Sequence, residues 1–88
     1  MISTKGRYAL RVLIDLAEQD TTTYVPLKEI AKRQGISEKY LQQIVKILVG
    51  KGLLTGISGK GGGYRLTASP EEYNVGEILE LMEAALHR

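Results

Sequence analysis

One glycine-rich stretch constrains the fold of this chain more than any other feature. It runs Ile57-Ser58-Gly59-Lys60-Gly61-Gly62-Gly63-Tyr64-Arg65-Leu66. Four of the five residues 59–63 are glycine, and residues typical of strands stand on both sides. Two strand-like runs around such a link predict a β-hairpin, with strands over about 53–58 and 64–67. Because each glycine adds conformational entropy that folding must remove, so many in one hairpin indicate more than simple flexibility.

Two short helices with a glycine turn between them are predicted directly before this hairpin, over about residues 27–49. Pro26 stands at the start of the first helix, where its missing N–H costs little. Gly35 ends that helix, because a left-handed C-terminal position favours glycine. Ser37 is a suitable N-cap for the second helix, which we expect to end near Val49.

The spacing within this pair of helices matches a helix-turn-helix unit that begins at Leu27. Its fifth residue is the small Ala31, where the helices can cross closely, and its ninth is Gly35, which suits a turn with positive φ. Apolar residues fill the wedge between the helices: Ile30, Ile36, Leu41 and Ile44. Gln34 departs from the pattern, since an apolar residue is more usual there. The alternative is an unrelated pair of helices with a glycine turn.

An amphipathic helix is also predicted before this unit, from Thr4 to about Gln19. Its apolar face follows the helical period and consists of Ala9, Val12, Leu13, Leu16 and Ala17. Leu10 and Ile14 add a second apolar stripe. A helix that is apolar on two sides either is central in its domain or packs against a partner.

A last helix is predicted over about residues 75–86, with Asn74 as its cap and Glu77 completing a capping box. Its apolar face consists of Val75, Ile78, Leu79, Met82 and Leu86. Residues 24–25 could add a short strand. The fold class is therefore mostly α with a small β-hairpin, and residues 1–88 form one winged helix-turn-helix domain.

The helix after Ser37 separates into two faces at about 100° per residue. One face is apolar and contains Leu41, Ile44, Val45 and Leu48, and nearly opposite lie Lys39, Gln42, Gln43 and Lys46. Lys can meet the acceptors of guanine, and Gln can bond bidentately to adenine. By itself such a face is more typical of an ordinary solvated surface. Its position between a glycine turn and a basic hairpin favours contact with DNA.

The glycine run itself has three competing explanations. A phosphate-binding loop for a nucleotide has a particular spacing and runs into a helix, whereas this run lacks the spacing and enters a strand. A dinucleotide-binding fingerprint fails because Tyr64 occupies the position of its last glycine. A wing remains, in which a slim backbone lies close to the DNA backbone or enters the minor groove while Lys60 and Arg65 supply charge.

The charge distribution favours a polyanionic partner for most of the chain. The net charge is +2, but residues 1–65 hold 11 Lys and Arg against 5 Asp and Glu, and residues 66–88 hold one Arg against five Glu. With no cysteine and one histidine, the chain has neither a thiolate metal site nor the ligands of an iron–sulfur cluster. No apolar run approaches the roughly 18–20 residues of a membrane span. We expect a cytoplasmic protein that is not an enzyme and holds no cofactor.

Five segments of the chain are distinctive in combination. They are STKGRYAL at 3–10, PLKEIA at 26–31, ISEKYLQQ at 36–43, GGGYRL at 61–66 and VGEI at 75–78. Together they closely resemble the Rrf2 family of bacterial transcription regulators, and the resemblance extends to about Glu83. It implies a homodimer that binds a partly palindromic operator in double-stranded DNA.

The resemblance also implies which residues meet the DNA. Base contacts of the family fall on Lys39, Gln42 and Gln43. Wing contacts fall on Ser58, Gly59 and Lys60. The family often has arginine where this chain has Ser58, so Lys60 or Arg65 is expected to supply the charge. Phosphate contacts fall on Thr4, Lys5, Arg7 and Tyr8. Lys46, on the polar helix face, is a further candidate for a phosphate contact.

The chain departs from this family at its C-terminal end. Family members usually continue into a long dimerisation helix, and many hold three cysteines in the loop before it, whereas this chain stops at Arg88 with neither. We therefore expect weakened dimerisation. The alternative function is a winged-helix module for protein–protein interaction without specific DNA binding, against which the positive balance of residues 1–65 argues.

Overall fold

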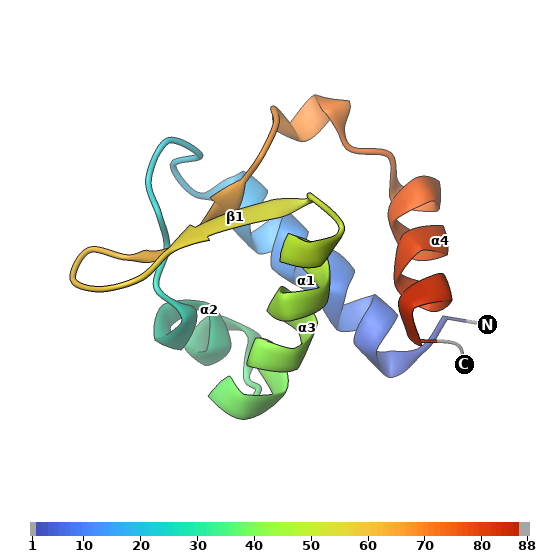
Figure 1. Ribbon diagram of the computed structural model, residues 1–88, viewed down its shortest axis with the longest axis horizontal. Coiled ribbons are helices and arrows are strands. Elements are labelled where there is room, and N and C mark those ends of the chain that lie inside the picture. The colour runs from blue at the N-terminus through green and yellow to red at the C-terminus, as the bar shows by residue number, and fades with distance from the viewer. Residues whose placement is uncertain (1, 87–88) are drawn as a thin grey trace.

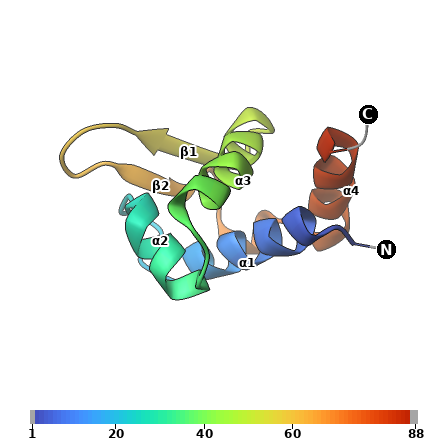
Figure 2. The same cartoon turned by 90° about the horizontal axis from the view of Figure 1, so that it is seen from below.

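The computed structural model describes residues 2–86, and within them it confirms the predicted fold class of helices with a small hairpin (Figure 1). The elements in chain order are α1 (Thr4–Glu18), α2 (Leu27–Gln34), α3 (Glu38–Gly50), β1 (Leu54–Ile57), β2 (Gly63–Leu66), the 3-10 turn η1 (Pro70–Glu72) and α4 (Val75–Leu86). The hairpin projects from one end of the molecule, and the start of α1 and the end of α4 lie at the other (Figures 1 and 2). In the described range, no helix has both the length and the apolar character needed to cross a membrane.

Helix α1 lies inside the domain, where it packs against α2, α3, β2 and α4. Its main apolar face is buried as predicted, except that Ala17 is half-buried. The second stripe behaves differently: Leu10 is half-buried, and Ile14 is 55% exposed. Central packing therefore accounts for one face of α1 and leaves the other at the surface.

The turn between α2 and α3 forms as the spacing predicts. Gly35 has φ of 67°, a left-handed conformation that other residues rarely adopt. Ser37 caps α3 by accepting a hydrogen bond from the Tyr40 N–H at 3.0 Å. Ile30 and Ala31 of α2 are buried, together with the whole apolar face of α3. The two helices are thus locked against α1 by apolar contacts.

The hairpin pairs Leu54 with Leu66 at its base and Ile57 with Gly63 at its outer end. In place of a strand at 24–25, Val25 alone bridges Tyr64, with two N–H to carbonyl bonds of 2.9 Å. A β-carbon on Gly63, whose φ is 151°, would collide with the Val25 carbonyl. Glycine is therefore required at that position by close approach of backbones.

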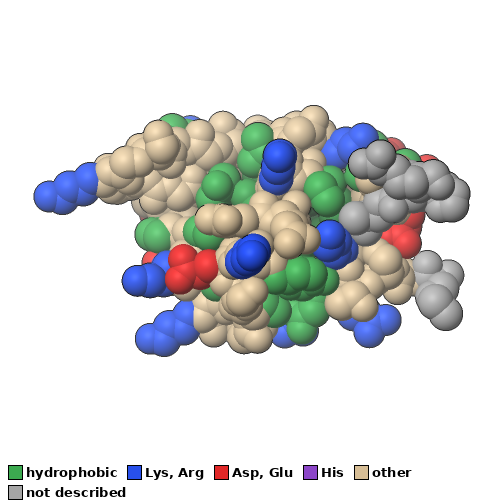
Figure 3. All heavy atoms as spheres, turned by 60° about the horizontal axis from the view of Figure 1, so that its bottom comes forward, with side chains coloured by type: hydrophobic (Ala, Val, Ile, Leu, Met, Phe, Trp, Pro, Cys, Tyr) green, Lys and Arg blue, Asp and Glu red, His purple; other side chains and the backbone are tan. Residues whose placement is uncertain are grey.

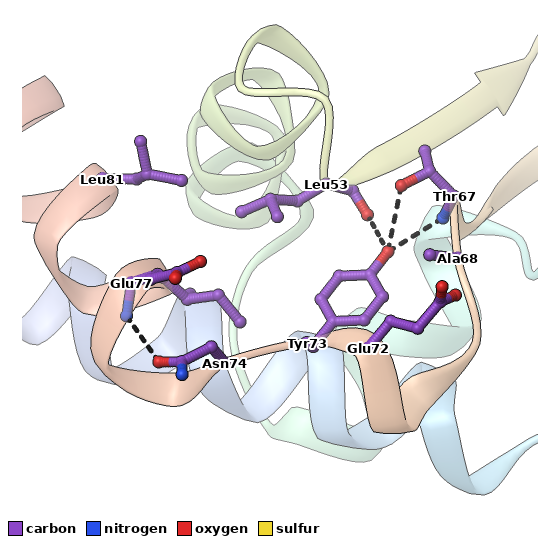
Figure 4. A pocket seen from close by; sticks show the side chains of 9 residues that line it. Leu53, Thr67, Ala68, Glu72, Tyr73, Asn74, Glu77 and Leu81 are labelled. Carbon is purple, nitrogen blue, oxygen red and sulfur yellow. Dashed lines mark hydrogen bonds between the residues drawn. The ribbon is translucent and has the colours of Figure 1, made fainter.

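The base of the hairpin is held by the hydroxyl of Tyr73, which Figure 4 shows at the centre of a polar junction. It donates to the Leu53 carbonyl at 2.7 Å and accepts from the Thr67 N–H at 2.9 Å. The Thr67 hydroxyl donates in turn to the Gly52 carbonyl at 2.8 Å. These bonds tie the end of α3 and both strands to the segment that leads into α4.

Helix α4 begins at its predicted cap, where the Asn74 side chain accepts from the Glu77 N–H at 3.0 Å. Ile78 and Met82 are buried against the core. Val75, which the prediction places on the same face, lines a depression together with Ile78. It is nevertheless 59% exposed, because it is the first residue of the helix and lies at the rim of the packed face. Leu79 is half-buried. The side chain of Leu86 lies outside the described part of the chain.

Candidate nucleic-acid interface

The polar face of α3 is open to solvent along the helix. Lys39, Gln42, Gln43 and Lys46 are all exposed. Their backbone positions are set by the opposite face, where Leu41, Ile44, Val45 and Leu48 are buried. Because buried side chains are close-packed, the polar side chains project from a rigid support. Such a helix has the diameter and the donor groups that the major groove accepts.

The wing, defined here as residues 54–66, carries a single basic residue in the turn between its strands. Ser58, Gly59 and Lys60 are all exposed there. Figure 3 shows a basic side chain at the far end of the wing and further Lys and Arg side chains spread across the neighbouring helices. Lys60 is therefore the group that brings positive charge to the wing's outer end.

Arg65 lies at the base of the wing and is engaged there. Its guanidinium donates to the Thr22 carbonyl at 2.9 Å and lies 4.5 Å from the centre of the Tyr24 ring. Both partners belong to the loop between α1 and α2. The sequence pattern offers Lys60 and Arg65 as equivalent sources of charge. In the fold, Lys60 lies at the outer end of the wing and Arg65 lies at its base.

Helix α3 and the wing enclose an open groove of about 510 Å³. It brings Ser58 of the wing together with Gln42 and Lys46 of α3, and all three are predicted contact residues. The rest of its lining consists of Val45, Val49, Gly56, Ile57 and Tyr64. Its two walls are thus a polar helix face and a slim strand, an arrangement that can receive a nucleic-acid backbone.

Sequence reasoning missed the apolar side chains at this groove. Ile57 is 50% exposed and Val49 is 40% exposed. Ile57 is exposed because the residue opposite it in the hairpin is Gly63, which has no side chain to cover it. The hairpin register would have revealed this exposure, but the alternation of residue types alone does not. An exposed apolar group beside a DNA-reading helix can contact the methyl group of thymine.

The start of α1 brings a second set of predicted contacts beside α3. Ser3 caps the helix by accepting from the Gly6 N–H at 2.9 Å. Thr4 and Arg7 are exposed, whereas Lys5 and Tyr8 are half-buried. The Tyr8 ring meets the ring of Tyr40 edge-on, with 5.9 Å between ring centres. Of the phosphate candidates on α1, Tyr8 is thus packed directly against the first turn of α3.

Arg33 of α2 is committed to contacts within the protein. Its guanidinium forms a bidentate pair with Asp15, with bonds of 2.7 and 3.0 Å, and also reaches Glu29 at 2.8 Å. The Asp15 hydrogen bond raises the pKa of Arg33. Among the described residues, no group of three His, Asp or Glu side chains is arranged so that it could hold a metal ion.

Comparison with known proteins gives a consistent result. Residues 2–88 match the model of the Rrf2 family, which is described as an iron-dependent transcriptional regulator. The chain is 39% identical over 85 residues to the HTH-type transcriptional regulator IscR of Aliivibrio salmonicida, covering 97% of this chain and 51% of IscR. It is 41% identical over 86 residues to protein Rrf2 of Nitratidesulfovibrio vulgaris, covering 94% and 57%.

A solved structure agrees with these sequence matches. CymR, the global cysteine regulator of B. subtilis, has a TM-score of 0.88 to this chain at 41% identity, covering 94% of this chain and 64% of CymR. The chain spans about half the length of the curated relatives it matches. Within that span the fold is shared. The chain belongs to the Rrf2 family of transcriptional regulators.

Proposed function

We propose that this chain binds double-stranded DNA sequence-specifically as a transcription regulator, with α3 in the major groove and the wing on the backbone or in the minor groove. One observation carries the proposal: Gln42 and Lys46 of α3 and the strands of the wing line the two sides of one open groove. Family membership supports it, since the matched relatives are named as transcriptional regulators. The mechanism is binding and involves no chemical step.

The contacts divide into three roles. Lys39, Gln42 and Gln43 would read base edges, because their donors and acceptors suit guanine and adenine. Lys46, with the α1 residues Thr4, Lys5, Arg7 and Tyr8, would bind phosphates and set the register. On the wing, Ser58 and Gly59 would allow close approach, and Lys60 would supply charge. Arg65 would act indirectly, by fixing the base of the wing.

We further propose that two copies bind a partly palindromic operator. Supporting this, Ile14 of α1 and Val75 of α4 are more than half exposed and line an apolar depression of about 190 Å³. Half-buried Leu10 belongs to the same depression. A symmetric dimer would cover this surface and would match a two-fold operator. Since bacterial DNA lies in the cytoplasm, the proposal also implies a cytoplasmic location.

The iron in the family's description does not fit the residues of this chain. The chain has no cysteine, and cysteine thiolates are the ligands that hold iron–sulfur clusters. The described acidic side chains form no metal-binding group either. We therefore propose that this chain binds DNA without a cofactor of its own.

Selection of bound DNA from a random pool, at one stated salt concentration, tests the function. We expect enrichment of one partly palindromic sequence, with a dissociation constant at least about a thousandfold below that for random DNA. Binding without enrichment would reduce the function to non-specific DNA association. Absence of binding at low salt would favour the protein–protein module instead.

A further inference from the structure

Gln34 is the residue that departs from the helix-turn-helix pattern, and the proposed contacts leave it without a role. Its amide nitrogen donates to Asp15 at 2.9 Å, and its amide oxygen accepts from the Arg11 Nε at 3.0 Å. Both ends of the amide are therefore used, each in a bond to α1. An apolar side chain, which is more usual at this position, could form neither bond.

Asp15, one of the two hydrogen-bond partners of Gln34, is buried and paired. The Asp15 side chain is 4% exposed, and burying a carboxylate is unfavourable unless it is paired and hydrogen-bonded. Burial alone would raise the pKa of Asp15, but hydrogen bonds from Arg33 and Gln34, together with the Arg33 charge, hold that pKa below its ordinary value. Asp15 thus stays ionised at neutral pH, and its oxygens orient the Gln34 amide.

Arg11, the second hydrogen-bond partner of Gln34, is connected to the first turn of α3 through two aromatic rings. The Arg11 guanidinium lies 4.9 Å from the centre of the Tyr8 ring, a cation–π distance. The Tyr8 ring meets Tyr40 at an interplanar angle of 86°. Tyr40 directly follows Lys39 and stands two residues before Gln42. A continuous series of directional contacts therefore joins a buried carboxylate to the end of α3 that carries the proposed base contacts.

We propose that Gln34 and Arg11 are positioning residues for base recognition, which fix the first turn of α3 against α1 without themselves reading DNA. The inference rests on the proposed DNA-binding function. Hydrogen bonds and the edge-on ring contact have preferred geometries, so they add orientation to the support that apolar burial gives α3. Bidentate bonds to base edges require such placement, while phosphate attraction depends mainly on charge. Loss of these contacts should therefore reduce discrimination between sequences more than overall affinity.

Two variants test this. Gln34→Leu restores the usual apolar residue, and Arg11→Lys keeps the charge but loses the planar guanidinium. Glu29→Gln is the matched control, because it removes the negative charge of the exposed partner of Arg33 and leaves the Asp15 side intact. For each protein, dissociation constants are measured for the selected operator and for random DNA over a series of salt concentrations. Thermal unfolding and the NMR amide shifts of residues 39–43 are measured without DNA.

We expect both variants to lower the operator-to-random affinity ratio by about three- to tenfold, to shift the amides of residues 39–43, and to keep the salt slope. The control should leave all three unchanged. An unchanged ratio in Arg11→Lys would overturn the inference, even if Gln34→Leu proves too unstable to measure. An equal fall in the control, or parallel loss on both DNAs, would also overturn it. If the wild-type protein shows no preferred sequence, the proposed function fails first.

Discussion

Helix α3 and the wing face the same groove, but different interactions hold them there. The helix buries four apolar side chains in the core, whereas the wing buries only Leu54, Gly63 and Leu66. The wing depends instead on the Val25 bridge and on the hydroxyl of Tyr73. Apolar burial supplies most of the stabilisation, and directional polar contacts set orientation. Helix α3 should therefore unfold only together with the core, whereas the wing can open without unfolding the rest of the domain.

The largest effect should come from the core side of α3. Ile44 is fully buried, so Ile44→Ala should lower the free energy of unfolding by about 3 kcal/mol, through lost burial and a cavity. Val49→Ala on the same helix is the control, since Val49 is 40% exposed and should cost less than about 1 kcal/mol. Urea unfolding measures both. Similar losses would contradict a helix held by burial.

The dependence of the wing on its contact with Val25 is tested at Gly63. Gly63→Ala should lower the free energy of unfolding by about 2 kcal/mol, because φ is 151° and the new β-carbon would meet the Val25 carbonyl. Gly50→Ala is the control, since nothing lies within 4 Å of a β-carbon there. Amide exchange of Tyr64, which bonds Val25, should accelerate more than exchange in α3. Uniform acceleration throughout the chain would mean that the wing does not open separately.

Base reading is tested on the polar side of α3. Gln43→Ala should weaken operator binding by about 1.5 kcal/mol, because an unpaired base edge remains. Gln19→Ala is a matched control, an exposed glutamine at the far end of α1. Binding to random DNA should change little in either variant. Equal weakening on operator and random DNA would remove the base-reading role of Gln43.

The smallest effect should appear at the wing's outer end. Lys60→Ala should weaken binding to all sequences alike and reduce the salt slope by about 0.9, the contribution of one phosphate contact. Lys60→Arg keeps the charge and should retain the slope. A salt titration of both variants on random DNA decides the matter. An unchanged slope in Lys60→Ala would show that this side chain does not contact a phosphate.

Much of the fold was predictable because local signals agreed with one another. Gly35 and Ser37 mark the turn through backbone conformation and capping, which depend on neighbouring residues only. The apolar face of α3 follows the helical period, so its burial was predictable too. The exposure of Val75 was not, because periodicity cannot show where a helix leaves the core. The exposure of Ile57 depends on the register opposite Gly63, which is set by pairing across the hairpin.

By itself, the sequence determined the order of the elements, the polar face of α3 and the wing, since these follow from residue type and spacing along the chain. Only the tertiary structure decided that Arg65 binds the loop of Thr22 while Lys60 stays at the outer end. It also decided that Gln34 joins Asp15 to Arg11. Both outcomes depend on contacts between distant segments. Long charged and amide side chains can reach several partners, and only the packed fold selects one.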